Sequence, residues 1–246
     1  MSPSRPEDLV PSSVGELVIS ILAQPAPLLF LDTAAIFDVA RVPYRQALRV
    51  DLLESAMDLV EDLVAHPKRV WVACSANVMH EFASNRDSIA LELQKYIAEL
   101  QNSFSKSAQI ARLILPDRRI ASFEWLEADF KDRILGVLER LTASIAVFRG
   151  SPDCMVRARN RVWERRAPSG NSRQQFKDCE IFEEFLDLVA QLRALRFDQA
   201  AVFVTPNSDD YGPPPKGYDP IASDLVSVKG QYAGNISWAR SIATQK

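Results

Sequence analysis

The chain has 246 residues, of which 47% are hydrophobic and 25% are charged, the composition of an ordinary globular protein long enough to bury a substantial core. Its net charge of −3 argues against a protein that coats nucleic acid along its whole surface. The three cysteines lack CxxC spacing and are accompanied by only two histidines, which argues against a zinc site and against a disulfide framework.

The sequence shows no signal for a membrane or for export. Its first residues lack a basic segment followed by an apolar core, and no apolar run approaches the ~18 residues needed to span a bilayer. We therefore expect one elaborated domain over residues 1–246, located in the cytoplasm and with no membrane partner.

The first part of the chain predicts helices that alternate with short buried strands. Apolar positions at helical spacing predict an N-terminal helix over 7–24, which ends at Pro25. The run Leu-Leu-Phe-Leu before Asp32 and the run at 69–74 are typical of strands buried on both faces of a parallel sheet. The periodic stretch between them, 46–65, predicts a helix.

The middle of the chain is almost wholly helical in pattern. From 75 to 148 the periodicity is interrupted only near 103–107 and at Pro116, which favours a helical insertion at about 85–150 over a separate domain. An amphipathic helix is then expected over 174–194.

The last part of the chain completes an α/β pattern. The apolar run at 200–205 predicts a third buried strand, and a turn-rich loop follows it. A short helix near 220–226, a short strand near Val228 and a final helix through Trp238 are expected after that loop. Strands separated by helices imply parallel pairing, so we predict an α/β fold with a central, mostly parallel sheet.

A basic stretch at 157–177 reverses the charge of the chain locally. It holds seven basic residues against the single acid Glu164. The stretch is either a solvated helix face, because some arginines recur every four residues, or a phosphate-binding loop. The better candidates for contact with RNA phosphates lie nearest the loop: Arg165, Arg166, Arg173 and Lys177. Trp163 and Trp238 have the rings to stack on bases, but burial in the core is the preferred interpretation.

Acidic and polar residues follow the predicted strands. In an open parallel sheet, ligands bind at the carboxyl ends of the strands, so side chains at those positions carry the most weight. Four segments reach this edge, and their candidate residues are Asp32, Glu81, Asp178 and the group Asn207, Asp209 and Asp210.

Clustered carboxylates repel one another unless cations neutralise them. Mg²⁺ or Mn²⁺ is the natural cofactor, because these ions take oxygen ligands and bridge to phosphate. We therefore expect such an ion at this edge of the sheet, among the oxygens of these four segments.

Four short motifs resemble those of PIN domains. Leu-Phe-Leu-Asp-Thr at 29–33 is similar to the opening strand and first acid, and Asn-Val-Met-His-Glu-Phe at 77–82 is similar to the second motif. Lys-Asp-Cys-Glu-Ile-Phe-Glu at 177–183 resembles the third, and Phe-Val-Thr-Pro-Asn-Ser-Asp-Asp-Tyr at 203–211 resembles the fourth. Their order suits the PIN-like branch that carries a long helical insertion and a basic loop before the third acid.

This resemblance implies a three-layer α/β/α fold and metal-dependent endonucleolytic cleavage of RNA that leaves a 5′-phosphate and a 3′-hydroxyl. Asp32, Glu81 and Asp178 match the metal-binding carboxylates of the family. The expected metal ligands are these three and Asp209, and the expected catalytic set joins Asn207 and Asp210 to the same three acids. One position departs from the pattern, because Asn207 stands where many PIN nucleases have a fourth acid. Either Asp209 or Asp210 compensates, or the activity is weakened.

Each candidate also has a purely structural interpretation. Asp32 is a preferred helix N-cap, Asp178 suits a helix N-terminus, and Glu81 by itself is a typical solvated helix residue. Asn207, Asp209 and Asp210 are turn formers. Thr33 and Thr205 either support the acids or satisfy local backbone. On an ideal helix Glu183 lies roughly 140° around from Asp178 and Glu180 about 160°, so neither is assigned to the site.

Two further functions are weighed against the nuclease. One is a PIN-like module without catalysis that binds RNA or a protein. The other is a phosphatase of the haloacid-dehalogenase type, which needs a second acid two residues after Asp32, where this chain has Ala34. Motifs of nucleotide-binding enzymes and serine hydrolases are absent. A homodimer, an inhibitor protein and another partner protein all remain open.

Overall fold

The structure is a computed structural model that describes residues 10–114, 129–170 and 175–244. Its centre is a six-stranded sheet with the order β1-β4-β3-β2-β5-β6, and every pairing within the described residues is parallel. The predicted α/β fold is therefore confirmed. The strands are β1 (Ser12–Ser13), β2 (Leu28–Leu31), β3 (Trp71–Ser75), β4 (Ala146–Arg149), β5 (Ala201–Val204) and β6 (Gln231–Ala233).

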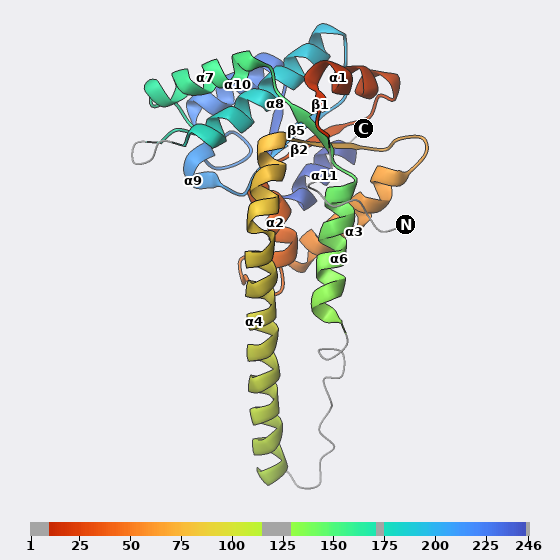
Figure 1. Ribbon diagram of the computed structural model, residues 1–246, viewed down its shortest axis with the longest axis vertical. Helices are drawn as coiled ribbons and strands as arrows, with labels where there is room; N and C mark the ends of the chain where they lie inside the picture. The colour runs from red at the N-terminus through yellow and green to blue at the C-terminus, as the bar shows by residue number, and fades with distance from the viewer. Residues whose placement is uncertain (1–9, 115–128, 171–174, 245–246) are drawn as a thin grey trace.

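Helices cover both faces of the sheet and complete three layers (Figure 1). One layer holds α1 (Val14–Ala23), α7 (Pro152–Trp163), α8 (Phe176–Ala194) and α10 (Asp219–Val228). The other holds α2 (Thr33–Arg41), α3 (Val50–Val64), α4 (Ala76–Ile114), α6 (Phe130–Ala143) and α11 (Ile236–Thr244). The short α9 (Ser208–Tyr211) lies in the loop after β5. The far half of α4 projects well beyond the body (Figure 1).

The two central strands explain why their sequences are continuously apolar. All four residues of β2 and all four of β5 are buried, because helices pack on both faces of the sheet. Phe30 pairs in register with Phe203, and their rings lie 5.9 Å apart between centroids. Aromatic side chains from α8, including Phe182 and Phe185, pack against Phe203 on the same side.

The N-terminal helix begins later than predicted. It starts at Val14, because Ser13 forms a capping box with Glu16 and residues 12–13 pair with β4. Residues 7–9 of the predicted range lie outside the described residues. The Ser13 N–H donates to Glu16 Oε2 at 2.7 Å.

The helical interpretation of 75–148 is wrong at two places. No break occurs near 103–107, since α4 continues to Ile114, and the break predicted at Pro116 lies outside the described residues. The stretch also contains a strand, β4, which lies between β1 and β3 in the sheet and has Val147 and Phe148 buried. The helical insertion therefore ends at Ala143 and not at about 150. The last strand is Gln231–Ala233, whereas Val228 ends α10.

No helix within the described residues combines the length and apolar character needed to cross a membrane.

Candidate active site

Asp32 lies at the carboxyl end of β2 and is held by two hydrogen bonds. Its Oδ1 accepts from the Thr33 N–H at 2.7 Å, so the residue is also the N-cap of α2. Its Oδ2 accepts from Thr205 Oγ1 at 2.7 Å, and Thr205 directly follows the neighbouring strand β5. Asp32 is only 5% exposed, so these contacts fix a buried carboxylate at the edge of the sheet. Asp32 therefore caps α2 and at the same time places its carboxylate at the carboxyl edge of the sheet.

Thr33 connects the first acid to the second. Its Oγ1 donates to Glu81 Oε2 at 3.1 Å, which brings α4 against the start of α2. Asp178 lies in the first turn of α8, and its backbone carbonyl accepts from the Tyr211 hydroxyl at 3.1 Å. The sequence left the role of Thr33 and Thr205 open, and the structure shows that both bind acids of the site.

The loop after β5 contributes Asp210 to the acidic group. Asn207 Nδ2 donates to Asp210 Oδ2 at 2.6 Å, and the Asn207 N–H donates to Thr205 Oγ1 at 3.2 Å. Asp209 is exposed, and its contact is a hydrogen bond from the Tyr218 hydroxyl to its backbone carbonyl at 3.3 Å. The structure therefore places Asp210 with the other acids, with Asn207 as its support, and turns Asp209 to the surface.

The carboxylates are close enough to disfavour one another's ionisation. Burial, together with the negative charges of Asp32, Asp210 and Glu81, raises the pKa of Asp178 to about 7, and the charge of Lys177 opposes this shift. Burial also raises the pKa of Asp32 to about 6, although the hydrogen bonds from Thr205 and Thr33 oppose this. Four acids from four segments thus share one poorly compensated region of negative charge.

These residues fit a hard divalent cation by their chemistry. All four offer carboxylate oxygens, and within the described residues the Asp178 carboxylate receives no hydrogen bond and forms no ion pair. Within the described residues, however, no group of three or more His, Cys, Asp or Glu side chains is placed so that it could hold a metal ion. Asp32, Glu81 and Asp210 are each held by a hydrogen bond from a neighbour.

Helix α8 is tied to the elements beside it by two acids that the sequence did not assign to a role. Glu180 accepts a hydrogen bond from Asn77, one turn before Glu81 on α4. Glu184 accepts from the Gly150 N–H at 3.1 Å and also bonds to Ser75 at the end of β3. These ties fix the helix that carries Asp178 against the helix that carries Glu81. Glu183 points elsewhere, because it binds arginines of α7.

Gly150 leaves the space that the Glu184 side chain occupies. A Cβ on this residue would lie 2.4 Å from Glu184 Cγ. We expect Gly150→Ala to lower the free energy of unfolding by about 1–3 kcal/mol through overpacking, measured by urea denaturation. Gly15→Ala is the control, since a Cβ there meets nothing within 4 Å. Equal stability of the two variants would contradict the close approach of Glu184.

Much of the basic stretch is engaged in ion pairs. Arg157 binds Glu183 and Asp187 at 2.7 and 3.1 Å. Arg161 is buried and binds Glu183, Asp224 and the Ala167 carbonyl. The stretch is helical to Trp163 and again from Phe176, where α8 begins, and residues 171–174 between them lie outside the described part of the chain.

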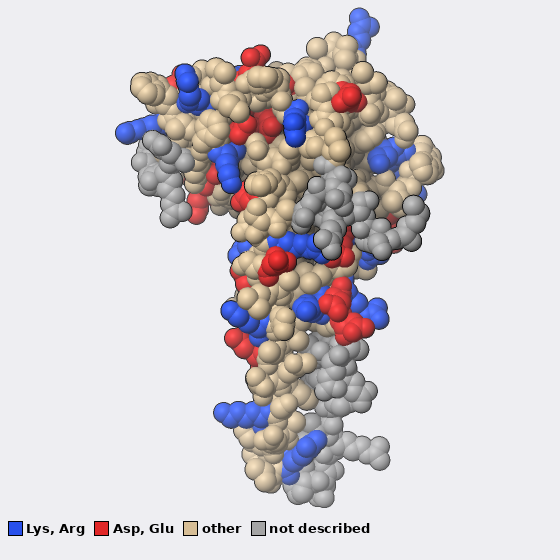
Figure 2. All heavy atoms as spheres, in the orientation of Figure 1, with Lys and Arg blue, Asp and Glu red and all other residues tan. Residues whose placement is uncertain are grey.

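The four residues predicted to contact RNA phosphates differ in their ion pairing and exposure. Arg166 forms an ion pair with Asp224, while Arg165 and Lys177 are exposed and form none within the described residues. Arg173 lies outside those residues. Figure 2 shows basic and acidic side chains mixed over the face in view, with no extended patch of one sign.

Trp163 is on the surface and not in the core. It is 89% exposed at the end of α7, which overturns the preference for burial, and Trp238 is 37% exposed. A large aromatic ring at the end of a basic helix, with its face in solvent, is available for stacking.

Comparison of the chain with models of protein families, with curated proteins and with solved structures gave no match.

Proposed function

We propose that this chain is a PIN-like, metal-dependent endoribonuclease that hydrolyses RNA phosphodiester bonds with Mg²⁺ or Mn²⁺ as its cofactor. The observation that carries the proposal is the convergence of Asp32, Glu81, Asp178 and Asp210 at the carboxyl edge of the sheet, where burial, together with the charges of the other three acids, raises the pKa of Asp178. The four motifs that resemble PIN domains supply the same acids, with Asp210 in place of the amide Asn207.

The roles of the residues follow from their contacts. Asp178 has the least engaged carboxylate of the four and is the principal ligand, whereas Asp32 and Glu81 are oriented by Thr205 and Thr33. A divalent cation bound by these acids supplies an activated water and neutralises charge on the phosphate. Exposed cations, Arg165 and Lys177, are placed before and at the start of α8 to hold the anionic backbone.

Cleavage of labelled RNA tests the proposal. A pool of structured and single-stranded RNAs is incubated with the protein in Mn²⁺, in Mg²⁺ or in EDTA, and products are separated on a denaturing gel. We expect internal cleavage with either metal and none in EDTA. Intact RNA under every condition, with protein shown to be folded by circular dichroism, would contradict the nuclease.

Trp163 offers a second, independent readout of RNA binding. We expect Trp163→Ala to weaken the Kd for a single-stranded oligonucleotide about 5- to 100-fold, the loss of one stacked base, measured by fluorescence anisotropy in EDTA so that no cleavage occurs. Met155→Ala is the control, because Met155 is 55% exposed on the same helix but has no ring. An unchanged Kd for Trp163→Ala would exclude stacking there.

A binding module without catalysis is the second candidate. It is favoured by Asn207 at the fourth motif and by the fact that, within the described residues, no group of three or more His, Cys, Asp or Glu side chains is placed to hold a metal ion. RNA binding that persists in Asp32→Asn and in EDTA, together with no cleavage, would support this function in place of the nuclease.

A further inference from the structure

A pocket of about 800 Å³ lies at the edge of the sheet opposite the acidic site. It is lined by the turn between α8 and β5 and by the turn between α10 and β6, with Ile242 of α11 beside them. Both turns lead into the amino ends of parallel strands, whereas Asp32 and Thr205 follow carboxyl ends. Pockets of roughly 300–1,000 Å³ are typical of sites for small organic ligands. The pocket is therefore a candidate ligand site separate from the acidic one.

Arg193 of α8 joins the two turns that line the pocket. Its guanidinium donates to the carbonyls of Phe197 and Gln199 in the first turn, at 2.6 and 2.8 Å. It also donates to the carbonyls of Val228 and Lys229 in the second turn, at 3.2 and 3.0 Å. These four hydrogen bonds hold the turns in place, so the pocket is formed before any ligand binds.

Each turn places one cation in a left-handed backbone conformation. Arg196 has a φ of 64° and Lys229 a φ of 52°. Each lies just past the end of a helix, where glycine is the usual residue because a side chain makes this conformation unfavourable. Backbone strain of this kind is concentrated at ligand sites. A cation also stabilises a helix C-terminus, which explains each residue alone but not the convergence of both on one pocket.

The pocket carries an excess of positive charge. Arg193, Arg196 and Lys229 line it together with a single acid, Asp198. The Asp198 carboxylate accepts a hydrogen bond from the Gln199 amide at 3.0 Å. The side chains of Arg196 and Lys229 are exposed and form no hydrogen bond or ion pair with the described residues. Their donors are therefore available to an anionic group in the pocket.

The rest of the lining suits a flat organic group. Val226 is 76% exposed, and Phe197 and Ile242 add further apolar surface. Gln199 and Gln231 also line the pocket. A glutamine amide both donates and accepts hydrogen bonds, as does the edge of a nucleobase. A nucleotide combines the anionic group, the flat ring and the polar edge that this lining matches.

From these features we propose that the pocket binds a nucleoside monophosphate, with Arg196 and Lys229 on the phosphate and the apolar residues against the base. The same chemistry is offered by a free nucleotide and by the 5′-phosphorylated end of an RNA. The pocket uses none of the acids on which the proposed nuclease depends, so its test does not depend on nuclease activity.

Isothermal titration calorimetry in EDTA tests the proposal, because without divalent metal no RNA is cleaved. The probes are the 5′-monophosphates of the four ribonucleosides, the nucleosides themselves and inorganic phosphate. We expect saturable binding of at least one nucleotide, and binding at least about tenfold weaker for its nucleoside and for phosphate alone. Competition by a 5′-phosphorylated oligonucleotide, but not by its 5′-hydroxyl form, identifies an RNA end as the source, whereas no competition by either identifies the free nucleotide.

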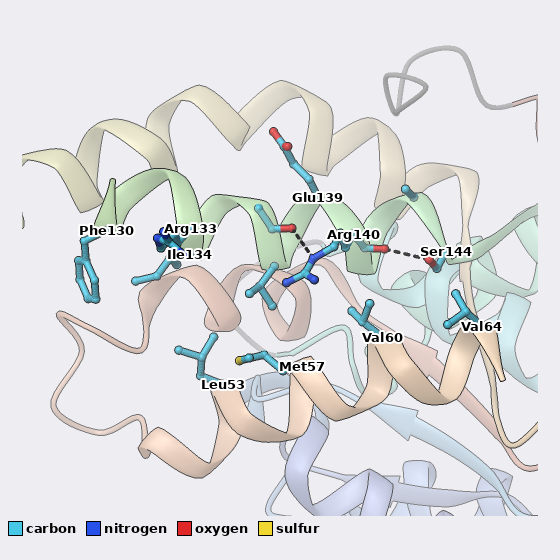
Figure 3. Close-up of a pocket in the computed structure, with 13 residues that line it drawn as sticks. Leu53, Met57, Val60, Val64, Phe130, Arg133, Ile134, Glu139, Arg140 and Ser144 are labelled. Carbon is cyan, nitrogen blue, oxygen red and sulfur yellow. Dashed lines mark hydrogen bonds between the residues drawn. The ribbon is translucent and has the colours of Figure 1, made fainter. Parts of the chain in front are cut away.

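Three variants assign the binding to this pocket. Arg196→Gly/Lys229→Gly removes both cations and suits the left-handed backbone, so we expect a folded protein that binds the nucleotide at least about tenfold more weakly. Arg196→Lys/Lys229→Arg keeps both charges and is expected to retain binding. Arg133→Gln/Arg140→Gln is the control, since it removes two exposed cations beside the apolar groove between α3 and α6 (Figure 3) and is expected to leave the Kd unchanged. Circular dichroism verifies that each variant folds.

Three results would overturn the proposal. The first is no heat of binding with any of the four nucleotides, and the second is equal affinity for a nucleotide and its nucleoside. The third is an unchanged Kd in Arg196→Gly/Lys229→Gly, which would place the nucleotide elsewhere. Asp178→Asn is expected to bind the nucleotide as the native chain does, so a loss of binding in that variant would assign the nucleotide to the acidic site.

Discussion

Asp178→Asn is expected to reduce Mn²⁺-dependent RNA cleavage at least about a hundredfold. The asparagine keeps the size of the side chain but removes the charge of the carboxylate that the other three acids face. The measurement is kcat/KM on a fluorogenic oligonucleotide, with Mn²⁺ varied so that weakened metal binding is separated from a slower chemical step.

Two neighbouring residues give this experiment a matched control. Asp210→Asn is expected to impair cleavage, since Asp210 lies beside Asp178, whereas Asp209→Asn is expected to leave it unchanged, because Asp209 faces solvent. Equal losses in the Asp209 and Asp210 variants would contradict the arrangement of the site, and full activity of Asp178→Asn would contradict its central role.

The stability of the protein is expected to fall by about 3 kcal/mol as pH rises from 4.5 to 7, through Glu184 alone. Burial raises the pKa of Glu184 from 4.5 to about 7, with Glu180 and Asp187 adding to the effect and the bonds to Ser75 and Gly150 opposing it. Between these pH values the Glu184 side chain is ionised in the unfolded chain but protonated in the folded chain. Ionisation therefore stabilises the unfolded state and lowers the free energy of unfolding. Below pH 4.5 both states are protonated, and above pH 7 the loss is complete.

Glu184→Gln measures how much the ionisation of Glu184 contributes to the pH dependence of stability. The amide cannot ionise, so the free energy of unfolding of the variant is expected to rise relative to the native chain by about 3 kcal/mol between pH 4.5 and pH 8. Guanidinium denaturation at several pH values measures it, and Glu164→Gln, at an exposed position, is the control. A difference between Glu184→Gln and the native chain that does not change with pH would show that folding does not raise the pKa of Glu184.

The strongest sequence signals predicted the fold well. The runs that became β2, β3 and β5 are continuous apolar segments followed by polar residues, and this combination is typical of central parallel strands. The strand β4 was missed because its four residues directly follow a long helical periodicity and only two of them are buried. The start of α1 was missed because the apolar pattern extends past the point where Ser13 caps the helix.

The acidic site could be predicted as a set of residues but not as a geometry. Position after a strand identified Asp32, and the motif pattern identified Glu81 and Asp178. The choice between Asp209 and Asp210 depends on the turn of α9, which a sequence pattern does not specify. The hydrogen bond of Asn77 to Glu180 and the insertion of Glu184 beside Gly150 join segments far apart in the chain, and no local signal marks such pairs.

In the basic stretch, the number of cations in the sequence overstates the positive charge that is free to bind an anion. Seven cations in sequence suggested an anion-binding surface, yet Arg157, Arg161 and Arg166 are matched by acids of α8 and α10. Those acids lie on other elements, so the pairing becomes visible only in three dimensions. Arg159, Arg165 and Lys177 form no ion pair within the described residues, and Lys177 directly precedes Asp178 in the chain.

Binding of Mn²⁺ to the RNA-free protein, measured by isothermal titration calorimetry at pH 8, tests the central claim most directly. The account predicts saturable binding by the native chain, retention of that binding in Asp209→Asn and its loss in Asp178→Asn. No heat of binding by folded native protein, or equal binding by the native chain and Asp178→Asn, would contradict an acidic site that holds a divalent cation.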